Sequence, residues 1–545
     1  MKFSTLLSYV TPHRRILLLI VLLLILGGVI SLANPWIAGQ LTANIFDAEN
    51  SRFTLRFILL IWTALLLLRA LLGFANQYFI GITGEEMSAA LRNRVYEHLQ
   101  MLPMAYYQDR KPGDLLSLLA NDSEIISHFI TGTLVQLLPQ LFVFAGALLM
   151  MAWLDWHIAL LAAILLPVYF IAIKLLGRRI RPFATRWIEA WSSMYAFAQD
   201  NLALIPAIKA FGREPLERLR FHGHNRTVVG HSRQQIRLQS LLSPTISLLA
   251  GLGMLLLLWL GLAQMESGRL SAGELVSLLL YAMLLTQPLS GLANVYGQSL
   301  LTRGAAERLL AFFAVQPEPI SSGQPPLSGE RGRVEFRQVS FTYPGREAVL
   351  QDFSLTIEAG ETIALTGPNG AGKTTLAHLL LRFIEPQSGC VLIDGQNIAQ
   401  VDIASLRQQV GLVAQHTLLL NASVAENICY GQPDATEADM KKAAKAARAD
   451  TFIEQLPEGY ASLIGDQGVR LSGGQRQRLS LARTLLRDPR ILILDEATAL
   501  FDPLGEQEFI EKCKEALTNR TVILITHRPA SLALASRIIA LETHG

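Results

Sequence analysis

The chain has 545 residues, of which 51% are hydrophobic and 17% are charged, and its formal net charge is +3. A chain of this length exceeds what one hydrophobic core normally organises, so we expect two or more domains. The small net charge argues against nucleic acid as a partner, and the apolar excess, which lies in roughly the first 300 residues, argues against an entirely soluble protein.

The N-terminal part of the chain holds six apolar segments, each near the length of about 20 residues that crosses a bilayer. They cover residues 16–37, 53–79, 128–153, 157–177, 241–264 and 273–300. A basic pair before a long apolar run also begins cleaved signal peptides, but this run continues to Trp36 and further spans follow it, so we expect a retained first span. Residues 1–315 are therefore predicted to form an all-α domain of six transmembrane helices.

The connections between the spans alternate in length and in basic content. The long segments 80–127 and 178–240 are cytoplasmic by the positive-inside rule, because the second is rich in arginine and the short connections are not. Apolar residues recur in the long segments at helical spacing, so we expect the helices to continue into the cytoplasm. The same orientation places three tryptophans at the outer interface: Trp36, Trp153 and Trp156.

Residues 316–332 are rich in Pro, Ser and Gly and are typical of a linker. Beyond them the apolar period changes, and short β-rich runs alternate with helical segments. The expected strands include Val334–Phe341, Thr362–Leu365, Val410–Val413, Ile491–Leu494, Thr521–Ile525 and Ile538–Leu541. This pattern predicts a layered α/β domain over residues 333–545. Three cysteines lie in this part without metal-ligand spacing, which favours a reduced, cytosolic compartment: Cys390, Cys429 and Cys513.

Residues 367–375 read GPNGAGKTT and fit the pattern of a phosphate-binding loop between a strand and a helix. The glycines let backbone N–H groups approach phosphate oxygens, and the following helix points its positive end at them. Lys373 adds a positive charge, and Thr374 offers a hydroxyl to Mg²⁺. The residues expected to hold the nucleotide here are Gly367, Asn369, Gly370, Gly372, Lys373, Thr374 and Thr375.

A second signal is the run Ile491–Leu494 followed by Asp495 and Glu496. A buried strand of a parallel sheet delivers its terminal side chains to the sheet's carboxyl edge, beside the phosphate loop. There Asp495 would organise Mg²⁺, and Glu496 would orient or deprotonate the attacking water. In isolation such a pair is more often a helix cap or a solvated turn, and the phosphate loop upstream reverses that preference.

A third signal is LSGGQ at residues 471–475, which opens a helix to about Leu486. A serine and two glycines at a helix N-terminus make a second anion site from backbone N–H groups. One phosphate loop needs no second site for its own nucleotide. The simplest explanation is that Ser472, Gly473, Gly474 and Gln475 serve ATP bound to another copy.

These motifs together resemble a half-transporter of the ATP-binding cassette (ABC) superfamily, of the exporter type with six spans and one nucleotide-binding domain. The resemblance implies a multidomain membrane protein whose α/β P-loop domain carries a helical subdomain. Tyr343 resembles the adenine-stacking aromatic, Gln415 the Q-loop glutamine that reaches Mg²⁺, and His527 the switch histidine at the γ-phosphate. Each is weak alone: a strand residue, a solvated turn and a satisfied histidine are the ordinary alternatives.

The resemblance implies that two nucleotide domains close head to tail around ATP and Mg²⁺. The ligands implied for the metal are Thr374, Gln415 and Asp495, and the catalytic residues are Glu496, His527 and Gln415. ATP binding would favour the closed dimer and an outward-facing membrane domain, and hydrolysis would release it. We expect a homodimer in a bacterial inner membrane with the nucleotide domain in the cytoplasm. A heterodimer, an importer on the same fold and a membrane-anchored ATPase without cargo remain alternatives.

Two features depart from the family pattern. After Glu496 the family has A-T-S-A-L-D, whereas residues 497–502 read ATALFD, so communication across the dimer is expected to differ. The sequence ends at Gly545 soon after the last predicted strand, without the closing helices that the resemblance implies. Two cytoplasmic segments resemble coupling helices, although ordinary turns would read alike: Asn121–Glu124, preceded by Gly113-Asp-Leu-Leu, and Leu204–Lys209.

The spans hold few ionisable residues. Arg69 lies deep in the second span, and it either meets an anionic head group or pairs with backbone carbonyls. Lys174 is expected to snorkel to the inner interface. Six polar residues are expected either to line the transport pathway or only to form hydrogen bonds between neighbouring helices: Gln136, Gln140, Tyr281, Gln287, Asn294 and Gln298. Pro288 is expected to kink the sixth span. The absence of acidic residues favours a small amphipathic, lipid or peptide cargo over a cation.

Overall fold

The computed structural model describes residues 11–46, 54–108, 110, 112–319, 323–329, 331–345, 347–415, 417–465, 469–496 and 517–542. The chain divides into two compact units. Unit 1 comprises residues 1–96 and 115–314, and unit 2 comprises residues 97–114 and 315–545. The segment 97–114, on the amino side of the linker, thus groups with the C-terminal part of the chain.

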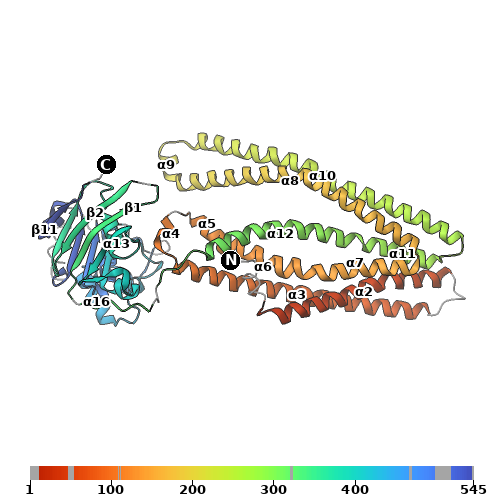
Figure 1. The fold of residues 1–545 in the computed structure, drawn as a ribbon, viewed down its shortest axis with the longest axis horizontal. Helices are drawn as coiled ribbons and strands as arrows, with labels where there is room; N and C mark the ends of the chain where they lie inside the picture. The colour runs from red at the N-terminus through yellow and green to blue at the C-terminus, as the bar shows by residue number, and fades with distance from the viewer. Residues whose placement is uncertain are drawn as a thin grey trace. The chain divides into compact units, whose positions relative to one another are not determined.

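Unit 1 is built from long helices (Figure 1). In chain order they are α2 (Arg14–Phe46), α3 (Leu55–Met101), α5 (Pro112–Ser117), the π-helical turn η2 (Leu118–Asp122), α6 (Ser123–His128), a second π-helical turn η3 (Phe129–Leu134), α7 (Val135–Leu154), α8 (Trp156–Ala203), α9 (Ile205–Ala210), α10 (Glu214–Glu266), α11 (Ala272–Leu284) and α12 (Thr286–Phe313). The last turn of α3 and the start of α5 belong to unit 2.

The six predicted spans fall on helical segments of this unit, the third mainly on η3 and α7 and the sixth on α11 and α12. Helices α8 and α10 have 48 and 53 residues. At about 1.5 Å per residue both are far longer than the bilayer core of about 30 Å, so neither fits within a bilayer over its whole length. The sixth span divides into α11 and α12 at Leu285, three residues before the expected kink at Pro288.

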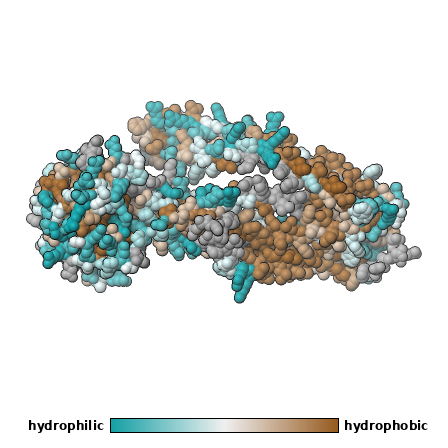
Figure 2. Space-filling view, viewed as in Figure 1, coloured by the Kyte–Doolittle hydropathy of each residue, from teal (hydrophilic) through white to brown (hydrophobic). Residues whose placement is uncertain are grey.

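Four helices of the described residues are long and apolar enough to cross a membrane. These segments are Arg14–Phe46, Leu55–Met101, Gly113–Leu154 and Ser247–Glu266, and two shorter apolar helices are Trp156–Val168 and Ala272–Leu284. Figure 2 shows apolar residues gathered on unit 1 where α2, α3 and α7 lie, and polar residues along the part of α8 and α10 near α9. The tryptophans predicted at the outer interface are all exposed: Trp36, Trp153 and Trp156.

Helix α2 packs closely on α11. The Tyr281 hydroxyl donates to the Leu32 carbonyl at 2.8 Å, and the Ser277 hydroxyl donates to the Pro35 carbonyl at 3.0 Å. Gly39 faces Gly273 so closely that a Cβ on it would lie 2.5 Å from the Gly273 carbonyl oxygen. Small residues allow such backbone approach between membrane helices, and the hydroxyl bonds fix the register of the pair. Tyr281 therefore serves helix packing, one of the two roles that the sequence left open.

The predicted coupling segment Asn121–Glu124 forms no separate helix, and its docking on a nucleotide unit stays a prediction. These residues lie within the continuous helical run that extends from α5 to α7. Asp122 and Ser123 are 1% and 0% exposed, and Asp122 accepts hydrogen bonds of 2.9 and 2.6 Å from the guanidinium of Arg308 on α12. Asp122 and Ser123 therefore serve helix packing, whereas Asn121 and Glu124 are exposed. The second predicted segment, Leu204–Lys209, does coincide with a short exposed helix, α9, which joins α8 to α10.

Unit 2 contains two main sheets and a helical subdomain. An antiparallel sheet has the order β2-β1-β4-β5, and a parallel sheet has the order β11-β3-β10-β9-β6. The strands are β1 (Val334–Thr342), β2 (Ala348–Ile357), β3 (Thr362–Thr366), β4 (Ser388–Ile393), β5 (Gln396–Asn397), β6 (Val410–Val413), β7 (Ala422–Ser423), β8 (Leu463–Ile464), β9 (Ile491–Asp495), β10 (Thr521–Ile525) and β11 (Arg537–Ala540).

The helices of unit 2 are α4 (Met104–Gln108), α13 (Lys373–Leu380), α14 (Ile403–Gln409), α15 (Val424–Cys429), α16 (Glu437–Ala446), α17 (Asp450–Ile453), α18 (Gly473–Leu486) and α20 (Pro529–Leu532), with single 3₁₀ turns η4 (Ile398–Gln400) and η5 (Gly459–Ala461). Helix α13 packs into the core around β1 and β3, whereas α15, α16 and α18 form a second apolar cluster. The sheet and the helical subdomain that the resemblance implied are thus present, and all predicted strands of the parallel sheet lie within one residue of their expected bounds.

The register of the parallel sheet brings its functional residues to one edge. Ile525 at the end of β10 pairs with Leu365 of β3 on one side and with Asp495 of β9 on the other. Val413 at the end of β6 pairs with Leu494. The carboxyl ends of four strands therefore lie side by side at one edge of the sheet. The polar residues that directly follow these strands lie at the same edge.

Candidate nucleotide site and membrane cavities

The phosphate loop joins β3 to α13 at this edge of the sheet. Gly372 caps α13 with a φ of +91°, a left-handed conformation that glycine adopts without strain. Gly367 has a φ of +138°, and a Cβ there would lie 2.4 Å from the Leu541 carbonyl oxygen. Asn369 and Gly370 lie at the exposed tip of the loop. The loop is thus shaped by backbone conformations that only glycine supports, as the motif predicts.

The first two side chains of α13, Lys373 and Thr374, have different hydrogen-bond partners. The Lys373 ammonium donates to the carbonyl oxygens of Gly367 and Pro368 at 2.7 and 2.9 Å, which holds its charge over the loop. The Thr374 hydroxyl donates to Oδ2 of Asp495 at 3.2 Å. Residues that are 121 positions apart in the sequence thereby form one oxygen-rich corner.

Asp495 is the acidic member of this corner and is only 8% exposed. Burial raises the pKa of its carboxyl group above the ordinary value, and the nearby charge of Glu496 raises it further. The Thr374 hydrogen bond and the charge of Lys373 act in the opposite direction. A hydroxyl and a buried carboxylate are hard oxygen donors, the ligand type that Mg²⁺ prefers, so the residues present fit the metal that the sequence predicts. The described residues hold no cluster of three or more His, Cys, Asp or Glu side chains that could bind a metal by itself.

Glu496 contacts the other two predicted catalytic residues. Its Oε2 accepts a hydrogen bond of 2.5 Å from Nε2 of Gln415, and its Oε1 lies 3.5 Å from Nδ1 of His527. The His527 side chain is 78% exposed and Glu496 is 23% exposed, so solvent reaches the pair. The glutamine and the histidine follow the ends of β6 and β10, and both lie in direct contact with the carboxylate after β9.

Gln477 is a site residue that the sequence analysis missed. Glu496 has a φ of +48°, which is strained for a residue with a side chain. The Nε2 of Gln477, on α18, donates to the Glu496 carbonyl oxygen at 3.3 Å, and the Glu496 amide donates to the Ile525 carbonyl at 2.8 Å. Gln477 is 2% exposed. Its position two residues after Gln475 does not indicate a functional role, because the side-chain amide of a glutamine within a helix ordinarily serves only packing.

The LSGGQ residues form a capped helix start. Ser472 is the N-cap of α18, its hydroxyl accepts from the Gln475 amide at 3.2 Å, and the Ser472 amide donates to Oε1 of Gln475 at 2.8 Å. Gly473 and Gly474 are the first two residues of the helix. Within the described part of the chain these four residues make no hydrogen bond to the phosphate loop. No hydrogen bond among the described residues therefore ties them to the nucleotide site of their own chain.

Tyr343 lies beside the loop's helix, with its hydroxyl 3.4 Å from Oγ1 of Thr375. Its ring packs edge-on against Phe341, with the ring centroids 4.8 Å apart. The altered segment 497–502 that the sequence analysis singled out lies outside the described residues, as do His544 and Gly545 at the end of the chain.

Comparison with known proteins identifies the family. Residues 17–289 match the family model of the ABC transporter transmembrane region, and residues 350–499 match the family model described as ABC transporter. The chain belongs to the ABC transporter family. It combines the helical transmembrane domain and the α/β nucleotide-binding domain of an ABC exporter in one chain, so it is a multi-pass membrane protein that binds ATP and couples its hydrolysis to transport.

Relatives of known name match nearly the whole chain. It is 34% identical over 547 residues to an ATP-dependent lipid A-core flippase of Acinetobacter baylyi, covering 99% of this chain and 94% of that protein. It is 33% identical over 481 residues to a fatty acid ABC transporter of Mycobacterium bovis, covering 88% and 76% of the two chains. A solved bacterial Atm1-family ABC exporter with ATP bound superposes with a TM-score of 0.84 at 27% identity, covering 98% of this chain and 95% of that one.

In unit 1 of this ABC transporter an open pocket of about 310 Å³ has a mixed polar and apolar lining. It lies between α2, α3 and α7 and is lined by Leu24, Gly27, Gly28, Ser31, Arg69, Leu72, Gly73, Asn76, Gln136, Pro139, Gln140, Val143 and Leu284. Arg69 is therefore brought together here with Gln136 and Gln140, which the sequence analysis named as pathway or helix-bonding residues. In the described part of the chain no carboxylate forms an ion pair with Arg69, and Oδ1 of the 7% exposed Asn76 has no hydrogen-bond partner.

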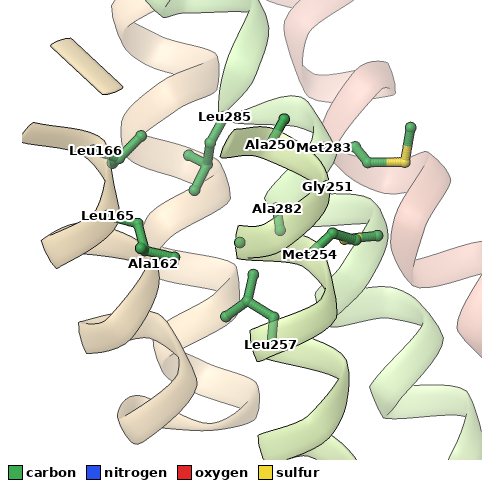
Figure 3. A pocket seen from close by; sticks show the side chains of 11 residues that line it. Ala162, Leu165, Leu166, Ala250, Gly251, Met254, Leu257, Ala282, Met283 and Leu285 are labelled. Atoms are coloured by element: carbon green, nitrogen blue, oxygen red, sulfur yellow. The ribbon is translucent and has the colours of Figure 1, made fainter. Parts of the chain in front are cut away.

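A second cavity, of about 320 Å³, is apolar throughout. Figure 3 shows Leu165 and Leu166 of α8, Met254 and Leu257 of α10, and Met283 around it. Flexible methionine side chains adapt to irregular apolar shapes. The side chains of Lys174, Gln287, Pro288 and Asn294, which the sequence analysis also named, lie outside the described residues.

Proposed function

We propose that two copies of this chain form an exporter that binds ATP with Mg²⁺ and moves an anionic amphiphile across a bacterial inner membrane. The observation that carries this proposal is the cavity around Arg69. An arginine near the middle of the predicted span 53–79 is costly in a bilayer, and such a residue usually serves a ligand or an ion path. With no carboxylate paired to it among the described residues, its charge is available to an anionic group.

The chemistry of the two membrane cavities supports an amphipathic cargo. Arg69, Asn76 and Gln140 offer hydrogen-bond donors to a phosphate or carboxylate head group, and arginine binds such groups through two parallel N–H groups. The apolar cavity offers a hydrocarbon surface for an acyl chain. Relatives whose names give a lipid or a fatty acid as cargo agree with this class of substrate.

Each residue at the sheet edge has a proposed role in hydrolysis. Lys373 and the amides of residues 367–375 would bind the phosphates, and Tyr343 would stack on the adenine. Thr374, Asp495 and Gln415 would hold Mg²⁺, which neutralises charge on the phosphates when bound. Glu496 would accept the proton of the attacking water, with Gln415 and His527 orienting both.

The second copy would complete the site. Ser472, Gly473 and Gly474 form a free helix start whose amides favour anions, and they make no hydrogen bond to the phosphate loop of their own chain among the described residues. We propose that they bind the γ-phosphate held by the other copy. Helix α9, which has no buried residue and exposes Ile205 and its neighbour Phe211, would dock on a nucleotide unit and transmit its closure.

The cargo proposal is tested by ATP hydrolysis in lipid nanodiscs of phosphatidylglycerol or of phosphatidylcholine. We expect the anionic lipid to stimulate hydrolysis in the parent chain and in R69K, and stimulation to be lost in R69Q, because only the lysine keeps the charge. The matched control is R56Q, which removes an exposed arginine at the start of α3. If R69Q responds to phosphatidylglycerol as the parent does, Arg69 does not bind the cargo and the proposal fails.

A further inference from the structure

Glu318 contacts two helices within unit 2, α3 at its last residue and α14 near its end. Its amide donates to the carbonyl oxygen of Met101, the last residue of α3, at 2.7 Å. The final carbonyls of a helix lack partners inside it, so this bond caps α3. Pro319 follows Glu318 and restricts the Glu318 backbone to an extended conformation.

The Glu318 carboxylate is held by Arg407 of α14. Nη1 and Nη2 of Arg407 donate to the two carboxylate oxygens at 2.8 and 3.0 Å. The side chains are 12% and 25% exposed, respectively, so the pair is largely shielded from water. Two parallel hydrogen bonds between planar groups fix orientation as well as distance, and lysine cannot reproduce them.

The same guanidinium also caps the phosphate-loop helix. Its Nε donates to the Leu381 carbonyl at 3.2 Å and its Nη2 donates to the Arg382 carbonyl at 3.3 Å, directly after α13. The guanidinium also lies 5.0 Å from the centre of the Phe383 ring. Arg407 is therefore anchored to the end of a helix whose first residue is the phosphate-binding Lys373.

We propose that the Glu318–Arg407 pair links the phosphate loop to the end of α3 and carries a nucleotide-dependent shift of α13 to that membrane helix. Helix α13 has eight residues and spans about 12 Å. A tilt of this short helix at Lys373 therefore also displaces Leu381 at its other end. From there the path is Arg407, Glu318 and Met101, with a hydrogen bond at every step. Glu318 and Arg407 act as positioning residues, since neither contacts the phosphate loop itself.

The test uses the full chain in nanodiscs with the E496Q substitution, which is expected to let ATP bind without turnover. Hydrogen exchange is measured at residues 97–108 and at residues 367–380, with and without Mg–ATP. In the E496Q parent, ATP should alter exchange in both segments. Adding E318Q or R407Q should abolish the change at 97–108 and keep it at 367–380, and the E318Q/R407Q pair should do no more than either alone. E318Q leaves the backbone bond to Met101 possible, so it removes only the ionic link.

The matched control is E385Q, which removes an exposed carboxylate paired with Arg382 in the same region and should leave both responses intact. A role confined to stability would raise exchange equally with and without ATP. Persistence of the ATP response at 97–108 in E318Q, or its absence in the E496Q parent, would overturn the inference. If R407Q does not fold, E318Q decides alone. The measurement needs no cargo, so it is independent of the outcome for Arg69.

Discussion

Replacing Gln477 by leucine tests whether the strained backbone of Glu496 is held for catalysis. The substitution keeps a buried side chain of similar size and removes the amide that donates to the Glu496 carbonyl at 3.3 Å. A buried acceptor left without its donor costs about 1–3 kcal/mol. The left-handed conformation of Glu496, with a φ of +48°, then has one fewer bond to hold it.

If this cost falls on the position of Glu496 in the transition state, kcat for ATP should drop by roughly 5- to 100-fold, because about 1.4 kcal/mol corresponds to a factor of ten. The KM for ATP should change little, since Gln477 is not in contact with the phosphate loop. Steady-state ATP hydrolysis by purified protein in nanodiscs measures both constants. The matched control is Q432L, which changes an exposed glutamine of the same unit and should leave them unchanged.

A thermal-unfolding measurement separates catalysis from stability in the same variant. The reasoning is refuted if Q477L is folded and hydrolyses ATP with a kcat within twofold of the parent. It is also refuted if KM rises while kcat is kept, because that result would place Gln477 in nucleotide binding.

Three further predictions follow from the described contacts. E496Q should lower kcat by roughly 100-fold or more while ATP still binds, because the general base is lost; ATP hydrolysis near the parent rate would contradict this. The pKa of Asp495 is raised by burial, so protons compete with Mg²⁺ at a higher pH than at an ordinary aspartate: the Mg²⁺ concentration for half-maximal activity should rise as pH falls toward that pKa, and the dependence should be absent if the carboxyl is ordinary. D122N should lower the free energy of unfolding by about 2 kcal/mol, reduced from a fully buried pair because Arg308 is 59% exposed, and an unchanged melting temperature would show that the pair adds nothing.

The strands and their terminal residues could be predicted because local and tertiary signals agree. Apolar β-rich runs end at Leu365, Leu494 and Ile525, and the register of the sheet places these ends side by side. Polar residues directly after such strands must lie at the carboxyl edge of the sheet. The contacts of Asp495 with Thr374 and of Glu496 with Gln415 follow from that geometry.

Other features depend on contacts between residues far apart in the sequence. Asp122 lies in a segment that resembles a coupling helix, but its partner Arg308 is 186 residues away and buries it. Glu318 lies in a Pro-rich linker that composition marks only as a connection, and its role depends on Arg407, 89 residues away. Gln477 looks like any helix residue until the strained Glu496 lies beside it. In each case the deciding fact is a long-range partner that no local pattern encodes.

The most direct test of the central proposal is ATP-driven movement of a fluorescent anionic lipid in proteoliposomes. The vesicles contain phosphatidylglycerol that carries a fluorescent label on one acyl chain. Dithionite added outside quenches the label only in the outer leaflet. Added Mg–ATP reaches only the copies whose nucleotide units face outward, so their cytoplasmic leaflet is the outer one. The account predicts that ATP moves the probe into the inner, protected leaflet, that E496Q does not, and that R69Q moves it poorly. Movement in the opposite direction would indicate an importer, and equal movement in the parent and E496Q would contradict ATP-driven export.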